Sequence, residues 1–274
     1  FFGGPQGWTG GEHRLKISPN GAVAARWSTH GFDDRAFIKL TDGETLMKMP
    51  WDWPGAMDAG WHVRARPSEA GGIVVETALT GAKMLEVSAG PPPSAGQGDP
   101  WQHRTIPQLS NSGDRLVSVD CWSRGYKDTF EEHATLSVWS LPSGTLERKV
   151  ELEVGCEEWA FEPRLVLDDA ATIAVVAGDH TTLSAVDLST GELMTAEIPS
   201  AETEEVFFPY VRPIVDVALS ADGTLIAVVD DSETLRILDR ATMTLLSSAP
   251  AAIFPIDADS YMPTFGTPLS FSPD

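Results

Sequence analysis

The chain has 274 residues, 42% of them hydrophobic, and its 40 acidic residues outnumber the 19 basic ones to give a formal net charge of −21. This length suffices for one large β-domain or two ordinary domains, and no apolar run reaches the roughly 18 residues of a membrane-spanning helix. The acidic charge argues against recognition of nucleic acid through its phosphates and against binding to anionic membrane surfaces.

The chain begins with "FFGGPQGWTGGEH" (1–13), which has neither the basic start nor the apolar core of a signal peptide. Its glycine-rich part precedes no predicted helix, so a phosphate-binding loop is not expected. We interpret this stretch as a flexible entry segment.

From residue 14 onward, hairpin-like segments recur along the chain. Each has an apolar or alternating strand, a polar turn and a second apolar strand, as in "DVALSADGTLIAVVDD" (216–231). The other copies are 14–27, 61–77, 107–122 and 164–179, and "TPLSFSPD" (267–274) repeats the beginning of the pattern. The turn positions are Ser18, Ser68, Ser110, Asp168, Ser220 and Ser272, with gaps of 50, 42, 58, 52 and 52 residues. A period of roughly 50 residues with this strand content predicts a radial β-repeat.

Each repeat continues with a second pair of strands around a tight turn, at 35–49, 134–150, 181–198 and 233–248. Four short strands in each unit predict an all-β fold, a β-propeller built from four-stranded antiparallel blades. The predicted blades are 13–50, 60–88, 103–152, 163–199 and 214–249, and 267–274 begins an incomplete sixth blade. We expect residues 1–274 to form one propeller domain, an excerpt of a longer chain with a ring of about seven blades. The alternative is that residues 1–12 complete the last sheet.

These repeats resemble the WD-repeat family of β-propellers over most of residues 13–274. The segments "LSADGTLIAVVDDSETLRILD" and "LSAVDLSTGEL" carry the resemblance best. The Trp-Asp dipeptide of the family appears here as Trp139-Ser140, Val186-Asp187 and Leu238-Asp239, and its Gly-His pair is absent. The resemblance implies the propeller fold, while the altered dipeptides depart from the family's internal polar network.

No motif for catalysis or cofactor binding stands out. The sequence has no Gly-x-Ser-x-Gly elbow, no Gly-Lys-Ser/Thr phosphate loop and no His-Glu-x-x-His pair, so we expect no catalytic residue, cofactor or metal. The six histidines are scattered along the chain. The acidic pairs, including Asp168-Asp169, Asp230-Asp231 and "DADS" (257–260), lie in or beside predicted loops, where solvated turn residues are expected.

The two cysteines, Cys121 and Cys156, have a spacing of 35 that fits no zinc motif. Two cysteines make no disulfide framework, and Cys121 follows a predicted strand, so we expect a buried structural thiol. The expected environment is reducing, and the expected location is the cytoplasm. Cys121 also opens the segment 121–133, which is predicted to enlarge the turn between the second and third strands of its blade.

Three segments between predicted blades are rich in aromatic residues: 50–61, 204–213 and 254–265. Each follows a fourth strand, so in a propeller all three emerge on one face. Exposed aromatic side chains often anchor protein interfaces. The candidate partner-binding residues are Trp51, Trp53, Phe207, Phe208, Tyr210, Phe254 and Tyr261. The alternative is that these segments pack onto their own blades, since Trp is usually mostly buried, and Trp61 belongs to this alternative as well.

The leading functional prediction is a non-catalytic module for protein–protein interaction, a scaffold or sensor fused to or assembled with other domains. This prediction rests on fold analogy, because rigid blades display variable loops to partners. The alternatives are a ligand-binding or enzymatic propeller with its site at the central channel, and the gating propeller of a peptidase. A cluster of acids, histidines or a metal at one end of the channel would favour the enzyme.

Overall fold

In the computed structural model, the regular secondary structure is entirely β, in five four-stranded antiparallel sheets. The structure describes residues 13–17, 21–28, 36–48, 56–68, 71–88, 90, 101–125, 130–156, 163–178, 181–199, 214–230, 234–251 and 269–271. Within these ranges, no helix has the length and apolar character needed to cross a membrane. The predicted all-β class and the four-stranded units are confirmed.

The strands follow one another in chain order within each sheet. The first sheet contains β1 (His13–Ile17), β2 (Val23–Ser28), β3 (Ala36–Lys39) and β4 (Thr45–Lys48), and the second contains β5 (Ala56–Met57), β6 (Val63–Pro67), β7 (Gly72–Thr77) and β8 (Lys83–Ser88). The third contains β9 (Gln102–Leu109), β10 (Arg115–Arg124), β11 (Glu131–Ser140) and β12 (Thr145–Leu152). The fourth contains β13 (Arg164–Leu167), β14 (Ile173–Ala177), β15 (Thr182–Asp187) and β16 (Leu193–Glu197). The fifth contains β17 (Ile214–Leu219), β18 (Leu225–Asp230), β19 (Thr234–Asp239) and β20 (Thr244–Pro250).

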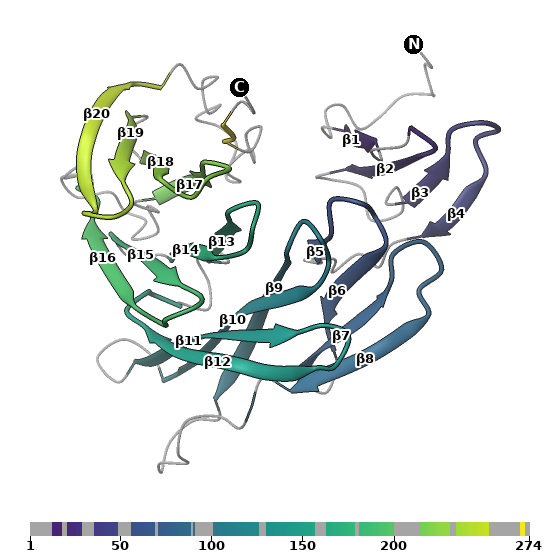
Figure 1. Ribbon diagram of the computed structural model, residues 1–274, viewed down its shortest axis with the longest axis horizontal. Coiled ribbons are helices and arrows are strands. Elements are labelled where there is room, and N and C mark those ends of the chain that lie inside the picture. The colour runs from purple at the N-terminus through teal and green to yellow at the C-terminus, as the bar shows by residue number, and fades with distance from the viewer. Residues whose placement is uncertain are drawn as a thin grey trace.

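The five sheets lie along an arc, with the first strand of each sheet on the inside and the fourth strand on the outside (Figure 1). Inner strands of neighbouring sheets contact one another: β5 touches β9, β9 touches β13, and β13 touches β17. The inner strands of the second to fifth sheets therefore follow one another along the inside of the arc. Leu269 donates its backbone N–H to Asp216 Oδ2 on β17 at 2.6 Å, so residues 269–271 lie close to the innermost strand of the fifth sheet.

Apolar clusters fill the space between neighbouring sheets. They contain Ile73 and Leu116 between the second and third sheets, Val119 and Val176 between the third and fourth, and Leu183 and Ile226 between the fourth and fifth. All six of these side chains are fully buried. A sheet packed on both faces needs apolar residues on both sides of its strands, which explains the continuous run "IAVVA" of β14.

The outermost strands carry a repeated irregularity. In four of them, one residue is left without a partner in the pairing with the third strand, namely Leu46 in β4, Met84 in β8, Glu147 in β12 and Leu246 in β20. Such β-bulges twist an exposed edge and discourage pairing with another chain. The unpaired edges of the sheets are thereby protected at one recurring position.

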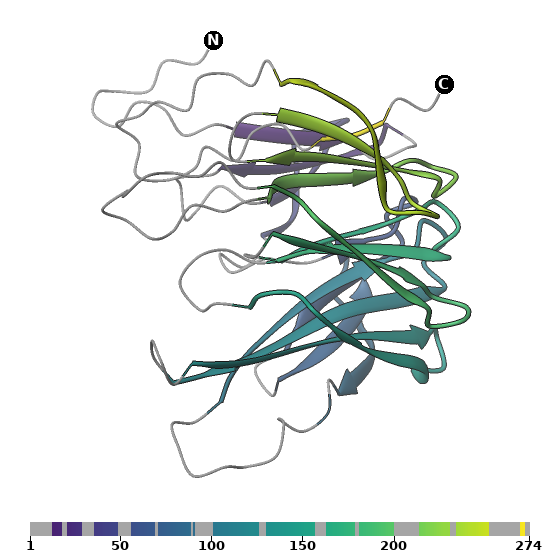
Figure 2. The same cartoon turned by 90° about the vertical axis from the view of Figure 1, so that its left-hand side faces the viewer.

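The antiparallel order gives the molecule two sides. On one side, which we call the turn face, lie the turns between first and second strands and between third and fourth strands, seen at the right of Figure 2. On the other side, the connection face, the second and fourth strands end and the first and third strands begin. The connections between sheets therefore depart from the connection face.

The second sheet differs from its predicted form. It begins at Ala56, and its first turn contains Asp58, whereas Ser68 lies between β6 and β7. With Asp58 in place of Ser68, the first two gaps become 40 and 52 residues (58 − 18 and 110 − 58). The assignment of Ser68 was wrong for two reasons. The first strand, β5, has only two residues, and Ser68 closes a similar turn by accepting the Gly71 N–H at 3.0 Å.

The segment 121–133 is also different from the prediction. β10 extends to Arg124 and β11 begins at Glu131, so much of this segment lengthens two strands and does not enlarge a turn. Ten residue pairs connect these two strands, from Arg115 with Ser140 to Arg124 with Glu131. The third sheet consequently extends further toward the connection face.

Candidate functional site

Four of the first turns share one kind of buried anchor residue: Asp58, Ser110, Asp168 and Ser220. The side-chain oxygen of each anchor accepts hydrogen bonds from the backbone N–H groups four and five residues later. The N···O distances are 2.7 and 2.7 Å for Asp58, 3.1 and 3.0 Å for Ser110, 2.7 and 2.7 Å for Asp168, and 3.1 and 2.9 Å for Ser220. Backbone donors in a tight turn need such partners, so the anchors set the shape of each turn.

The residue three places after each anchor has a left-handed backbone. These residues are Trp61, Gly113, Ala171 and Gly223, with φ values of 61°, 72°, 48° and 70°. Glycine adopts this conformation freely, whereas alanine and tryptophan do so at a steric cost. Trp61 and Ala171 are both buried, so packing holds them in place. Trp61 thus packs into the protein, as the alternative interpretation of its segment expected.

Hydrogen bonds link the first turns of successive sheets. The Ala59 N–H donates to Asn111 O at 3.2 Å, Asn111 Nδ2 donates to Asp169 Oδ1 at 2.7 Å, and the Asp169 N–H donates to Ala221 O at 3.3 Å. These three bonds run from the second sheet to the fifth. We call this series the turn lattice. It joins four sheets into one rigid edge on the turn face.

A turn between third and fourth strands also rests on a carboxylate. Asp187 Oδ1 accepts the Ser189 hydroxyl at 2.6 Å and the backbone N–H groups of Ser189 and Thr190 at 2.9 Å each. These bonds, led by the one from the Ser189 hydroxyl, lower the pKa of Asp187 to about 2. Arg148 of the third sheet donates to the carbonyl oxygens of Ser189 and Thr190 at 2.5 and 2.8 Å. The Arg148 side chain therefore holds this turn against the neighbouring sheet.

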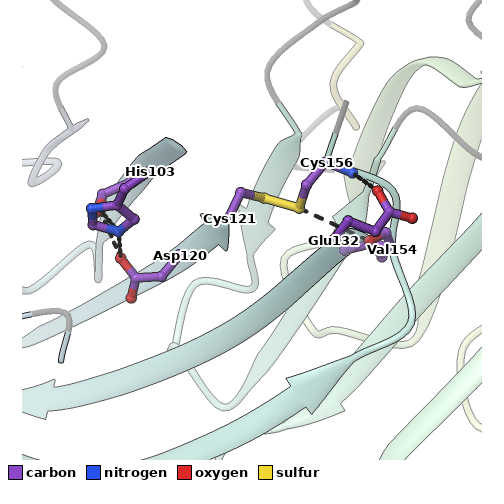
Figure 3. The surroundings of a disulfide bond; sticks show 7 residues. His103, Asp120, Cys121, Glu132, Val154 and Cys156 are labelled. Atoms are coloured by element: carbon purple, nitrogen blue, oxygen red, sulfur yellow. Dashed lines mark hydrogen bonds and ion pairs between the residues drawn. A yellow bond between two sulfur atoms is a disulfide. The ribbon is translucent and has the colours of Figure 1, made fainter. Parts of the chain in front are cut away.

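A polar cluster lies within the third sheet, near the connection face. It comprises His103, Thr105, Ser118, Asp120 and Trp122, and Asp120 is fully buried. The Asp120 carboxylate accepts the Thr105 hydroxyl at 2.7 Å and the Ser118 hydroxyl at 3.1 Å, and His103 Nε2 lies 3.3 Å from it (Figure 3 shows the His103–Asp120 pair). The His103 ring stacks on Trp122 with centroids 3.9 Å apart.

The cluster has the residue types of a catalytic triad but not its geometry. In a triad, one ring nitrogen of histidine faces the nucleophile and the other faces the acid. Here a single nitrogen, His103 Nε2, faces both Thr105 Oγ1 at 3.0 Å and Asp120 at 3.3 Å. The Thr105 hydroxyl also directs its proton to Asp120. Thr105 is therefore not activated as a nucleophile, and the cluster is a closed structural network.

The fifth sheet contains an acid at the equivalent position. Asp230 follows Ser220 by ten residues, as Asp120 follows Ser110, and it is also fully buried. Asp230 accepts the Thr234 N–H at 2.9 Å and Arg236 Nε at 2.8 Å. The prediction that the acidic pairs are solvated turn residues is therefore wrong for Asp230, and it is wrong for the buried Asp168.

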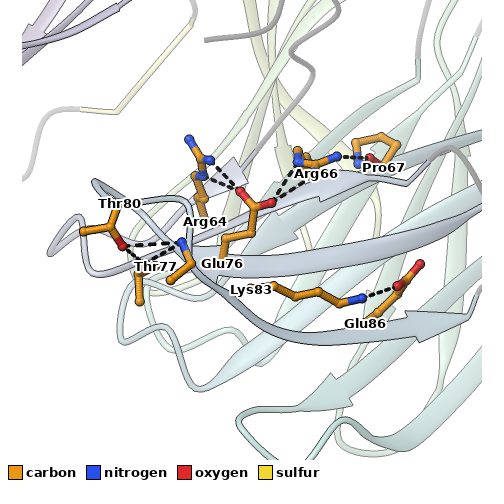
Figure 4. Close-up of polar contacts among 9 residues, drawn as sticks. Arg64, Arg66, Pro67, Glu76, Thr77, Thr80, Lys83 and Glu86 are labelled. Atoms are coloured by element: carbon orange, nitrogen blue, oxygen red, sulfur yellow. Dashed lines mark hydrogen bonds and ion pairs between the residues drawn. The ribbon is translucent and has the colours of Figure 1, made fainter. Parts of the chain in front are cut away.

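The second sheet contains a buried group of charges. Arg64 Nε donates to Glu76 Oε2 at 2.8 Å, and Arg66 Nε and Nη2 donate to Glu76 Oε1 at 3.1 and 2.9 Å (Figure 4). Arg64 and Glu76 are buried, while the Arg66 side chain is about one-third exposed. Both carboxylate oxygens are thus bonded to guanidinium groups. The group is an internal ion pair that orders β6 against β7 and does not form an open anion site.

A disulfide joins Cys121 on β10 to Cys156, which follows β12, with a Cα–Cα distance of 5.6 Å (Figure 3). Both cysteines are buried. The prediction of burial for Cys121 is confirmed, but the prediction of a free thiol is wrong. Only the folded sheet shows that residues 35 apart in sequence lie within bonding distance. The cytoplasmic location was predicted partly because the cysteines were expected to be free thiols, and the disulfide removes that argument.

Sequence reasoning missed the buried acids, although a signal was present. Asp120 and Asp230 end the apolar runs "LVSVD" and "IAVVD" at the same position of their repeats. An acid that closes a buried strand in two repeats indicates an internal hydrogen-bond acceptor. Glu76 likewise ends an apolar run, "IVVE", but its arginine partners are set by the pairing of β6 with β7.

One shallow groove lies between the fourth and fifth sheets. Its lining includes Ile198, Arg236, Leu238, Met243 and Leu245. Its volume of about 240 Å³ is below the range of roughly 300–1,000 Å³ typical of small-molecule sites. Among the described residues, no three His, Cys, Asp or Glu side chains are grouped so that they could hold a metal ion.

The candidate partner-binding residues lie outside the described residues: Trp51, Trp53, Phe207, Phe208, Tyr210, Phe254 and Tyr261. The "DADS" segment (257–260) also lies outside them. The structure does describe the strand ends that flank their segments. β4, β16 and β20 all end at the connection face, the side from which those segments depart.

No protein-family model matches the chain, and no curated protein shows significant sequence similarity to it.

Proposed function

We propose that the five sheets are blades of a WD-repeat-like β-propeller, and that the domain is a non-catalytic module for protein–protein interaction. The supporting observation is the arc of five four-stranded sheets, in which inner strands of the second to fifth sheets contact their neighbours and the turn lattice links the turns of the same four sheets. A rigid ring with variable connections on one face is a common framework for binding protein partners, and this step is an analogy from fold.

The described polar groups support a non-catalytic role. The Asp120, Asp230 and Glu76 carboxylates are each bonded to side chains or backbone of their own sheets. A catalytic group needs an open position beside the reacting atom of a substrate. These carboxylates instead serve the packing of the sheets.

The proposed binding surface is the connection face. Residues 50–55, 204–213 and 254–265 follow β4, β16 and β20, whose ends lie on this side. Residues 56–61 instead form β5 and the first turn of the second sheet, which lies on the turn face. Burial of the aromatic side chains of the three connecting segments against a partner would contribute a binding free energy of about 25 cal/mol per Å² of apolar area. The cost of association must be subtracted from this figure. Three segments separate in sequence then present one surface to one partner.

The test is site-specific photo-crosslinking in cells that produce the protein. A photoreactive amino acid replaces Trp53, Phe208 or Phe254 in turn. Matched controls carry it at Ser112 or Ser143, which are exposed on the turn face. We expect one and the same protein to be crosslinked from at least two connection-face positions and from neither control.

A second step separates binding from stability. Alanine at the crosslinking positions should abolish capture of that protein while the melting temperature stays within a few degrees of the wild type. Equal crosslinking from both faces, or loss of folding in every alanine variant, would contradict the proposal.

A further inference from the structure

The two bonded cysteines occupy the interior between the third and fourth sheets. Cys121 and Cys156 are 4% and 6% exposed. They belong to the same apolar cluster as Leu165 and Val176 of the fourth sheet. A soluble thiol or disulfide reagent cannot reach the sulfur atoms unless these sheets separate.

The segment that carries Cys156 is held from two further directions. The Cys156 N–H donates to Glu132 Oε2 on β11 at 2.8 Å (Figure 3). On the other side, Gly178 packs so closely on Gly155 that an added Cβ would overlap the Gly155 backbone. The segment around Cys156 is therefore held by these two contacts in addition to the disulfide.

We infer that the Cys121–Cys156 bond forms while the chain folds, in an oxidising compartment. It then remains as a permanent covalent link between β10 and the segment that follows β12. This inference is independent of the proposed binding role. Stable structural disulfides are rare in compartments whose thiols are kept reduced. The bond must form before the fourth sheet covers the sulfur atoms, because afterwards the oxidant has no path to them.

The oxidation needs a disulfide oxidant of the thiol–disulfide exchange class. The thiolate of one cysteine attacks a sulfur of the oxidant, forming a mixed disulfide and releasing one oxidant thiolate. The thiolate of the second cysteine then attacks the protein sulfur of this mixed disulfide and displaces the other oxidant thiolate. The two protein thiols lose two protons and two electrons, and the oxidant leaves as a dithiol.

The experiment measures the redox state and the accessibility of the full chain. Producing cells are quenched with acid, and free thiols are labelled with a maleimide that shifts the mass of the protein. We expect no label even when the quenched chain is unfolded in urea during labelling. After proteolysis, we expect the peptides that contain Cys121 and Cys156 to stay joined until a reductant is added. We also expect dithiothreitol to reduce the native chain at least about 100-fold more slowly than the chain in concentrated urea.

Two results would overturn the inference. Labelling of both cysteines, once the acid-quenched chain from its own cells has been unfolded in urea, would show that the bond is not formed there. Equal reduction rates in buffer and in urea would show an accessible bond that behaves as a reversible switch. The Cys121→Ala/Cys156→Ala variant is the labelling control, because it has no thiol to react.

Discussion

At the residue scale, the buried polar groups differ in whether they have partners. Thr105, Asp120 and Thr135 lie in one row across β9, β10 and β11. The Thr105 hydroxyl donates to Asp120 at 2.7 Å. Thr135 is 1% exposed, and its hydroxyl has no hydrogen-bond partner among the described residues. Two threonines thus flank Asp120. The Thr105 hydroxyl is hydrogen-bonded and stabilises the fold, whereas burial of the Thr135 hydroxyl without a partner among the described residues costs free energy.

This contrast leads to a matched pair of substitutions. Thr135→Val removes an unpaired buried hydroxyl at nearly constant volume, so the free energy of unfolding should stay unchanged or rise by up to about 1 kcal/mol. Thr105→Val removes a donor to a buried carboxylate and should lower the free energy of unfolding by about 2 kcal/mol. Urea unfolding followed by fluorescence measures both. A loss for Thr135→Val as large as that for Thr105→Val would mean that Thr135 has a partner.

Asp187 provides a prediction about pH. Its pKa is lowered to about 2 in the folded protein, so its stabilising effect is complete above the unfolded pKa of about 4 and disappears as the pH falls through the folded value. We expect Asp187→Asn to lower the free energy of unfolding by about 1 kcal/mol at neutral pH, after discounting for solvent screening. The difference should shrink between about pH 4 and pH 2. Denaturant curves across this range test it, and a constant difference would exclude the charge as the cause.

At the scale of elements, the repeat appears as a recurring turn. An anchor residue accepts two backbone N–H bonds, and the residue three places later takes a left-handed conformation. The third and fifth sheets have glycine at this position, whereas the fourth has Ala171. The turn geometry is therefore the same in these sheets, while its conformational cost differs.

A reciprocal exchange tests this cost. Ala171→Gly relieves a left-handed alanine but makes the unfolded chain more flexible, so we expect a change in unfolding free energy of less than about 1 kcal/mol, toward higher stability. Gly223→Ala should destabilise by more than about 1 kcal/mol, because φ is +70° and the new Cβ would lie 3.2 Å from Ile173 Cγ1. Thermal unfolding of both variants is the measurement. A loss of stability for Ala171→Gly together with a gain for Gly223→Ala would show that packing, not backbone conformation, controls this position.

At the scale of the whole molecule, the apolar clusters and the turn lattice join the second to fifth sheets to one another, and the disulfide adds a covalent link within the third. The clusters lie between sheets, and the lattice joins the turn face. The disulfide instead ties β10 to the segment that leaves the third sheet. It therefore restrains the connection face, on which we propose that the partner binds.

The disulfide also leads to a prediction for stability. It closes a loop with a sequence separation of 35 residues, and the loss of chain entropy in the unfolded state for such a loop is equivalent to about 3–4 kcal/mol. We expect Cys121→Ala/Cys156→Ala to lower the free energy of unfolding by about this amount. Wild-type protein unfolded in the presence of reductant should show a similar loss. A difference below about 1 kcal/mol in both would mean that the bond contributes little to the folded domain.

The strands, the four-stranded units and most of the turns could be predicted from the amino-acid sequence alone. These features depend on local chemistry, namely apolar runs for strands buried on both faces and Ser, Asp or Gly at the turns. "DVALSADGTLIAVVDD" therefore predicted β17, β18 and the turn at Ser220. The first turn of the second sheet was wrongly predicted at Ser68, because the two-residue strand β5 leaves almost no pattern in the sequence.

Which polar groups contact one another could not be predicted, because it depends on the three-dimensional fold. The pairing of Cys121 with Cys156, of Glu76 with two arginines, and of Asn111 with Asp169 depends on strand register and on the packing of one sheet against the next. Those distances arise from the fold as a whole, and no short sequence pattern encodes them. For the same reason, acids that resemble solvated turn residues in the sequence become buried acceptors, since burial is set by the neighbouring sheet.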